Sequence, residues 1–369
     1  MKDLMKQHAY ARLDMARGVA ALAVFIAHLG DVFFYRLIGP HHVVAQALSI
    51  LARHAVLVFF LMSGNLITRS IMMNIHRNDR FDVVEYGAAR LARIYPPLLG
   101  AIVVCVGVWL LVHFLHLPGG AVPFGLPGDL YRVREKFTLS TGDLIYALTM
   151  RGGLLEADGP LWSLYVEFQV YVVAMAVAAL WRGGWLARIV SCLLALICLR
   201  LLMGQLFFVL VWAFGAVTAL WIAPRRILLA GTVLAIAAIL VSLFTAPSLF
   251  STGMDRLDGQ VLQLICCVPY AALLFYMRPA RPYPRWLIAT GNFSYSLYVA
   301  HFPLLMLALS LSQGWIGYDI GRTWLVAGIA GASVIAFIIP FAAVTEQQGK
   351  FKRLLLMVLG RTGSAVKAV

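Results

Sequence analysis

The stretch PPLLGAIVVCVGVWLLVHFLH, residues 96–116, contains no Asp, Glu, Lys or Arg in its 21 positions. A helix needs about 20 mostly apolar residues to cross the hydrocarbon core of a bilayer, so this stretch predicts a transmembrane helix. The rest of the chain has the same character, because 62% of its 369 residues are hydrophobic and 12% are charged. A soluble core cannot bury that much apolar surface. We therefore expect a polytopic membrane protein.

Ten stretches in all are long and apolar enough to span a bilayer. All should be helices, because lipid offers backbone groups no other hydrogen-bond partners. We therefore predict an all-α fold of about ten transmembrane helices, with short turns at residues 182–184, at Gly204 and at residues 224–226. The predicted spans are 15–35, 50–68, 96–116, 160–181, 186–203, 205–223, 227–246, 260–278, 286–310 and 323–344.

The distribution of basic residues predicts the orientation, since Lys and Arg concentrate in cytoplasmic loops. With the N-terminus placed in the cytoplasm, 21 of the 30 basic residues fall on that side. This asymmetry accounts for the net charge of +14, so nucleic acid is not an expected partner. We predict both termini inside and one integral-membrane domain over residues 1–369 with its core at 13–344. Residues 117–159 should form an extracytoplasmic loop, and residues 345–369 a basic cytoplasmic tail.

Ionisable side chains inside the predicted spans are the first candidate functional groups, because each costs about 2.5–3.5 kcal/mol on insertion scales. Arg17 and His28 lie eleven residues apart, about 16 Å along the axis, and so share one face of the first span. Glu167 is the only acid placed well inside a span, and His301 lies within the ninth. A snorkelling anchor remains an alternative for Arg17, as does a satisfied inter-helix hydrogen bond for His28.

Two further motifs have both a structural and a functional interpretation. Ser63 and Gly64 lie at the centre of the second span, where small residues favour close helix packing over a nucleophilic serine. Arg90 and Arg93 lie three residues apart at the start of a helix, so they share one face. Paired guanidinium groups suit phosphate capture, although lipid headgroup contact is the simpler alternative.

These positions suggest a protein with different chemistry at its two faces. The arginines are expected at the inner face, and His28, Glu167 and His301 in the outer half of the bilayer. This polarity suits an enzyme that takes a phosphorylated donor from the cytoplasm, but a proton-coupled transporter would also place His and Glu inside its bundle. The five cysteines lie in apolar segments without metal-ligand spacing, so no metal site is expected.

With these motifs assembled, the chain resembles the membrane acyltransferase 3 family, bacterial enzymes that O-acylate cell-surface carbohydrates and some other acceptors. The resemblance runs from Leu13 to about Leu305, and its motifs occur in the family order. One departure is Phe168, which stands where the family usually has a second acid and leaves Glu167 without a partner. The matching motifs occupy residues 13–28, 59–64, 90–96, 162–171 and 294–301.

The resemblance implies transfer of an acyl group, most often acetyl, from cytoplasmic acyl-CoA to a hydroxyl of an extracytoplasmic carbohydrate or glycolipid. It also implies a multi-pass protein of the bacterial inner membrane, without a permanently bound cofactor or metal. A transporter or flippase of a lipid-linked sugar or small solute is the alternative. The implied catalytic residues are His28 (base), Glu167 (orienting acid) and His301 (oxyanion stabiliser or proton relay). Acyl-CoA would be bound by Arg17, Arg90 and Arg93. The supporting residues would be Asp14, Ser63, Trp162, Ser163, Gln169, Tyr295 and Tyr298.

Overall fold

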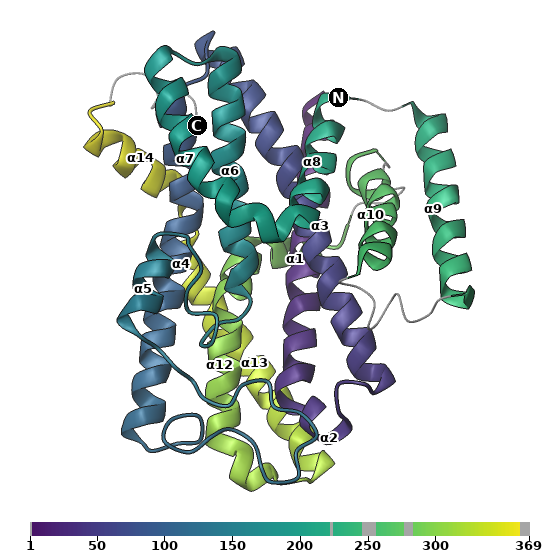
Figure 1. Ribbon diagram of the computed structural model, residues 1–369, viewed down its shortest axis with the longest axis vertical. Helices are drawn as coiled ribbons and strands as arrows, with labels where there is room; N and C mark the ends of the chain where they lie inside the picture. The colour runs from purple at the N-terminus through teal and green to yellow at the C-terminus, as the bar shows by residue number, and fades with distance from the viewer. Residues whose placement is uncertain (1, 222–223, 246–255, 277–282, 362–369) are drawn as a thin grey trace.

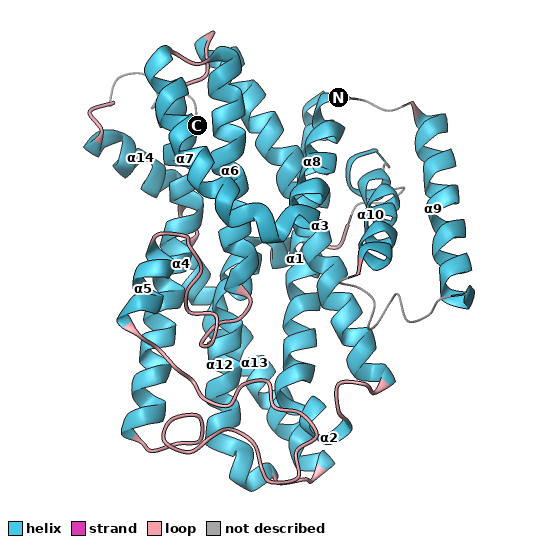
Figure 2. Ribbon diagram, viewed as in Figure 1, coloured by secondary structure: helices cyan, strands magenta, loops and turns pink. Residues whose placement is uncertain are grey.

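The computed structural model describes residues 2–221, 224–245, 256–276 and 283–361. Helices dominate these ranges, and no strand occurs within them (Figure 1, Figure 2). Eight helical stretches there are long and apolar enough to cross a membrane, which confirms the all-α membrane fold. They are Ala11–Phe33, Val43–Asn78, Val83–Phe114, Leu161–Arg182, Trp185–Leu220, Leu257–Tyr276, Arg285–Ile316 and Ile320–Val358.

The predicted spans 186–203 and 205–223 form the two arms of one bent helical stretch. α7 (Trp185–Leu202) descends from the upper end of Figure 1, and a 3₁₀ turn at Met203–Gln205 bends the chain. α8 (Leu206–Leu220) then returns to the upper end, so the two helices meet near the middle of the molecule (Figure 1). The bend explains why the structure has fewer full-length spans than the ten apolar stretches suggest.

The predicted span 227–246 corresponds to α9 (Arg225–Thr245), a helix of 21 residues, and residue 246 lies outside the described residues. α9 lies at the edge of the molecule in Figure 1, next to α10 (Leu257–Ala271).

The centre of the molecule is built from five long helices. α1 packs against both α3 and α12, and α12 in turn packs against α4 and α13. The stretch that contains α12, together with α6, has the largest buried share of the eight. The five central helices are α1 (Lys2–Phe33), α3 (Val43–Asn78), α4 (Val83–Phe114), α6 (Leu161–Arg182) and α12 (Ser294–Ile316).

The remaining helical elements are short or peripheral. α1 begins at the upper end of Figure 1, whereas α13 rises from the lower end and stops below the upper end, where Glu346 lies near Arg17 and Arg93. These elements are α2 (Tyr35–Ile38), α5 (Thr141–Leu148), the π-helical turn Ala272–Tyr276, α11 (Arg285–Ala289), the 3₁₀ turn Thr290–Phe293, α13 (Ile320–Thr345) and α14 (Gln348–Val358).

The connection at residues 117–159 folds back along the bundle. A buried ion pair of 3.3 Å between Arg36 and Asp129 ties it to α2, and the Gly125 amide donates to the Gln313 side chain of α12 at 3.1 Å. A capping box starts α5, which lies beside α4. Because this connection reaches into the molecule, α6 begins near mid-height in Figure 1 rather than at an outer surface.

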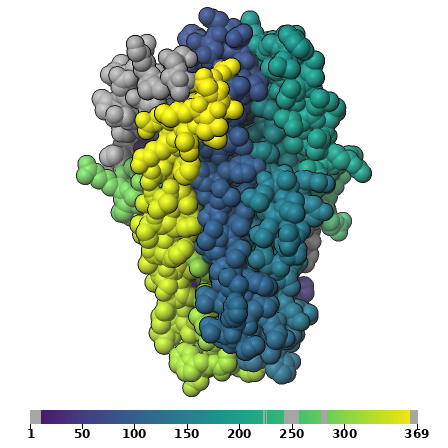
Figure 3. Space-filling model, turned by 90° about the vertical axis from the view of Figure 1, so that its left-hand side faces the viewer, coloured from purple at the N-terminus to yellow at the C-terminus, as the bar shows by residue number. Residues whose placement is uncertain are grey.

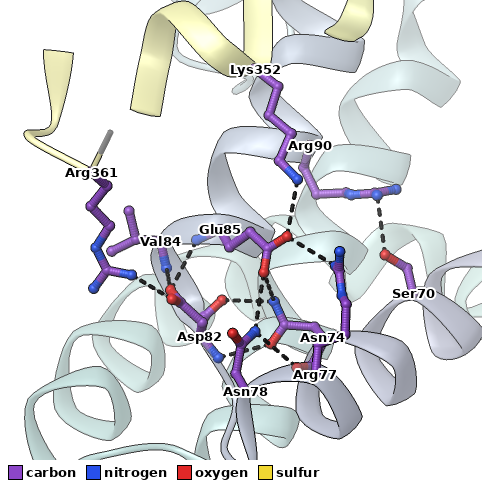
Figure 4. A network of polar contacts seen from close by, with 10 residues as sticks. All are labelled: Ser70, Asn74, Arg77, Asn78, Asp82, Val84, Glu85, Arg90, Lys352 and Arg361. Atoms are coloured by element: carbon purple, nitrogen blue, oxygen red, sulfur yellow. Dashed lines mark hydrogen bonds and ion pairs between the residues drawn. The ribbon is translucent and has the colours of Figure 1, made fainter. Parts of the chain in front are cut away.

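The described part of the predicted tail contains a helix, α14. It lies across the long axis of the bundle and covers the upper part of α4 (Figure 1, Figure 3). Figure 4 shows the polar network that holds it: Lys352 donates to Glu85 at 3.0 Å, and Arg361 pairs with Asp82. Glu85 also accepts from Arg77 at 2.9 Å, so α14 is tied to the corner between α3 and α4.

The contact between α3 and α8 is unusually close. A Cβ added at Gly64 would lie 1.9 Å from the Trp212 carbonyl oxygen, and one added at Gly215 would lie 2.1 Å from that of Leu61. Only glycine allows the two backbones to approach this far. The packing interpretation of Gly64 is therefore confirmed.

Candidate functional site

A cavity between the central helices brings together the three arginines predicted at separate positions in the sequence. Arg17 comes from α1, and Arg90 and Arg93 come from successive turns of α4. Glu167 of α6 is the only carboxylate among the residues that line the cavity, so the lining has an excess of two positive charges. Such a wall suits a ligand with several negative charges.

Each guanidinium is held by aromatic or polar neighbours. Arg93 lies 5.6 Å from the centre of the Tyr295 ring, a distance at which a cation and an aromatic ring attract. Arg90 lies 5.5 Å from the Tyr86 ring and donates to Ser70 at 3.3 Å. Planar guanidinium groups held in this way keep N–H donors for a bound anion.

Arg17 is held by a neighbour on its own helix. Its Nη1 atom lies 3.2 Å from Asp14 Oδ1, one turn earlier in α1. The Arg17 side chain is 18% exposed and that of Asp14 is 39% exposed, so the arginine is partly buried while its partner faces solvent. The structure thus brings the predicted supporting residue Asp14 next to Arg17.

A chain of hydrogen bonds runs from α8 to Glu167. Trp212 Nε1 donates to Ser63 Oγ at 3.2 Å, and Ser63 donates to the Tyr171 hydroxyl at 3.2 Å. Tyr171 in turn donates to the Glu167 carboxylate. The Ser63 hydroxyl therefore both accepts and donates, which fits the packing and support interpretation better than a nucleophile.

The position of Glu167 differs from the sequence-based expectation. It lines the cavity with Arg17 and Arg93 and was expected with His28 in the opposite half. The reason is that residues 117–159 fold into the molecule, so α6 begins near its middle and not at an outer surface. Every residue of α6 therefore lies farther from that surface than it would if the helix began there.

Two of the residues that line the cavity are joined through their hydroxyl groups. Ser163 and Tyr298 share a hydrogen bond of 2.5 Å, and Tyr298 also donates to the Pro160 carbonyl at 3.2 Å. The ring of Phe59 contacts Tyr298 edge-on at 5.5 Å. These contacts place the fourth-helix and late-helix motifs side by side, as their shared role in the resemblance implies.

Three other predicted supporting residues have structural contacts. Trp162 packs against the Phe208 ring at 4.9 Å, and Gln169 donates to the Met150 carbonyl at 3.0 Å. The hydroxyl of Tyr295 is buried and has no hydrogen-bond partner within the described residues.

His28 and His301 form a pair just beyond Tyr298. Their ring centres are 5.3 Å apart, and the ring centres of Tyr298 and His301 are 6.5 Å apart. His301 is fully buried, and its Nδ1 lies 2.8 Å from the Leu297 carbonyl oxygen. A carbonyl only accepts, so Nδ1 carries the proton and Nε2 has a free lone pair. That Nε2 has no partner in the part of the chain that the structure describes.

Sequence reasoning missed two acids near this site. Asp31 Oδ2 lies 3.7 Å from His28 Nδ1, and its position three residues after His28 was a signal that a helical wheel would have shown. Glu346, just after α13, accepts from the Ser296 amide at 2.9 Å and interacts electrostatically with Arg93. No sequence signal places Glu346 there, because the contact depends on how α13 packs.

The described residues contain no group of three or more His, Cys, Asp or Glu side chains that could hold a metal ion. The five cysteines are unpaired, and all but Cys192 are buried.

Comparison with known proteins identifies the family of the chain. A model of an acyltransferase domain, that of the acyltransferase 3 family, matches residues 10–343. The chain belongs to the acyltransferase 3 family. This acyltransferase is 26% identical over 357 residues to the acyltransferase MdmB of Streptomyces mycarofaciens, an alignment that covers 87% of the chain and 85% of MdmB. No solved structure matches it significantly. The resemblance deduced from the motifs is confirmed, and the acyltransferase is a multi-pass membrane protein.

Proposed function

We propose that the acyltransferase moves an acyl group from acyl-CoA to a hydroxyl of a carbohydrate or glycolipid on the other side of a bacterial inner membrane. The observation that supports this proposal is the cavity with Arg17, Arg90 and Arg93, together with the pair of His28 and His301 next to the lining residue Tyr298. Acyl-CoA has several phosphates at one end and a thioester at the other. The cavity offers cations for the first, and the histidine pair beside it offers imidazoles for the second.

The donor end is proposed to be cytoplasmic. The positive-inside distribution of Lys and Arg puts the start of α1 and the end of α13 on that side, and both lie in the upper half of the molecule (Figure 1). Acetyl is the proposed acyl group. The bilayer, the donor and the hydroxyl acceptor are the proposed partners, with no permanently bound cofactor.

The proposed reaction needs a base, because a neutral hydroxyl is a poor nucleophile. His28 takes the hydroxyl proton while the hydroxyl oxygen attacks the thioester carbon. The carbon–sulfur bond then breaks, and the protonated His28 returns the proton to the CoA thiolate. The free Nε2 lone pair of His301 accepts a hydrogen bond from a neighbouring hydroxyl of the acceptor and so orients the attacking one. The Arg17, Arg90 and Arg93 side chains hold the phosphates throughout.

CoA release from acetyl-CoA, measured with purified protein in nanodiscs, tests the proposal. Arg17→Ala should raise the KM for acetyl-CoA by roughly 10- to 150-fold, since hydrogen bonds to a charged group contribute about 1.5–3 kcal/mol. His28→Ala should lower kcat by about 10²- to 10⁴-fold with the KM unchanged, because it removes the base. Arg256→Ala is the control, as Arg256 is 77% exposed and lies outside the cavity lining.

The outcome against the proposal is also defined. If the wild-type protein neither binds nor turns over acetyl-CoA or succinyl-CoA while remaining folded, acyl-CoA is not the donor. If the Arg17 and Arg256 variants have the same KM, the cavity does not hold the phosphates.

A further inference from the structure

We propose that Asp31 is a positioning residue that orients His28 and thereby makes His28, rather than His301, the base of acyl transfer. This inference rests on the proposed function. It concerns a residue outside the matched segment at residues 13–28, and it gives a structural reason for the expected role of His28 as the base.

The backbone brings Asp31 to His28. Asp31 follows His28 by three residues on α1, so both lie on one face of the helix. Helical side chains lean toward the N-terminus, which directs the Asp31 carboxylate back over the His28 ring. His28 Nδ1 and Asp31 Oδ2 are 3.7 Å apart, and their side chains are 26% and 19% exposed. A small rotation of either side chain closes this distance to a hydrogen bond.

Asp31 also has a neighbour in the folded-back connection. Asp31 and Tyr131 line a second small cavity together with Arg134. Burial and the nearby Asp31 charge raise the pKa of Tyr131 to about 12, so its hydroxyl stays protonated at neutral pH. The carboxylate therefore has both a neutral tyrosine hydroxyl and the His28 ring as neighbours.

The two histidines differ in their means of stabilising a positive charge. His28 has a carboxylate beside it, whereas His301 makes no ion pair within the described ranges of the chain. His301 is fully buried, donates through Nδ1 to the Leu297 and Tyr298 carbonyls, and packs against the Phe25 ring. Burying an imidazolium there without a counter-charge is unfavourable. His28 is thus the ring that can take up a proton.

The orientation also defines which nitrogen reacts. When the Nδ1–H of His28 donates to Asp31, the lone pair is on Nε2. The hydroxyl proton moves to that Nε2 as the oxygen attacks the thioester carbon, and the same proton later moves to the CoA sulfur. Asp31 remains ionised throughout, so it changes neither the proton balance nor the products.

The rate test is a double-mutant cycle, measured as CoA release from acetyl-CoA with water as the acyl acceptor. Asp31→Asn should lower kcat by about 10- to 100-fold, which is less than the loss expected on removing the base itself. The KM for acetyl-CoA and the melting temperature should stay unchanged. In the His28→Ala background, Asp31→Asn should cause no further loss. Asp31→Glu should recover part of the rate. Asp258→Asn, a charge deletion at an exposed site on α10, is the matched control.

A second measurement does not depend on turnover. In protein labelled with ¹⁵N in the histidine rings, the His28 signals are identified by their absence from the spectrum of His28→Ala. They should show the Nδ1–H tautomer in the wild type and lose it in Asp31→Asn. Two results would overturn the role of Asp31. One is His28 signals that do not change in Asp31→Asn, and the other is a loss of kcat on Asp31→Asn that is as large in the His28→Ala background as in the wild type. If the tautomer changes as expected but the wild type releases no CoA, the proposed function fails and the orienting contact stands.

Discussion

Gly64→Ala should destabilise the acyltransferase more than any other change of one methyl group on α3. The added Cβ would lie 1.9 Å from the Trp212 carbonyl oxygen, 2.8 Å from the Ala216 amide nitrogen and 2.9 Å from the Trp212 carbonyl carbon. All three atoms belong to the α8 backbone, so no side-chain rotation relieves the overlap. The two helices must separate, and overpacking of this kind costs about 1–3 kcal/mol.

The cost extends to the site. Separation of α3 and α8 stretches the 3.2 Å hydrogen bond from Trp212 to Ser63, which contributes about 0.5–1.5 kcal/mol. The two effects together lower the free energy of unfolding by about 1.5–4.5 kcal/mol. Thermal unfolding of the protein in nanodiscs measures this loss, and a melting temperature several degrees below that of the wild type is expected.

Gly107→Ala on α4 is the matched control. A Cβ there has no heavy atom within 4 Å, and alanine improves helix propensity by about 1 kcal/mol. This variant should therefore be as stable as the wild type or more stable. Equal melting temperatures for Gly64→Ala and Gly107→Ala would refute the close contact between α3 and α8.

Two further predictions concern residues outside the cavity. Asp158 is fully buried, and burial raises the pKa of its carboxyl well above the ordinary value. The neutral carboxyl therefore stabilises the folded state at low pH, and this stabilisation is lost as the pH rises through the raised pKa. Melting temperatures between about pH 5 and about pH 9 should therefore decline less steeply for Asp158→Asn than for the wild type, and equal slopes would contradict this. Lys352→Gln removes the 3.0 Å pair with Glu85, so trypsin should cleave α14 faster than in Lys350→Gln, which loses an exposed charge. Equal cleavage rates would show that the pair does not hold α14 in place.

Local sequence patterns were sufficient to predict the helices. The turns predicted at residues 182–184 and at Gly204 occur where α6 ends and where α7 bends into α8, because Gly and charged residues interrupt an apolar run there. Hydropathy does not show whether two apolar helices cross completely or meet near the middle. That depends on how α8 packs against α3 through Gly64 and Gly215, which is a contact between segments far apart in the chain.

The candidate site was predicted as a set of residues but not as an arrangement. Arg17, Arg90 and Arg93 could be selected because each is a charge near a span, and the structure brings all three to one cavity. Glu167 was misplaced because its depth depends on a connection whose path the sequence does not reveal. Asp31 was missed because it lies at the end of a predicted span, where a charge needs no special explanation.

The attachment of α14 to the start of α4 has a practical consequence. Glu85 and Arg93 are eight residues apart on the same helix, about 12 Å along its axis, so the last described helix of the protein is fastened to the same rigid rod that carries two of the cavity arginines. A purification tag or fusion partner that displaces α14 therefore acts on that helix as well. An inactive C-terminal fusion is therefore weak evidence that the enzyme lacks a given substrate, and substrate screens are better interpreted with the carboxyl end left free.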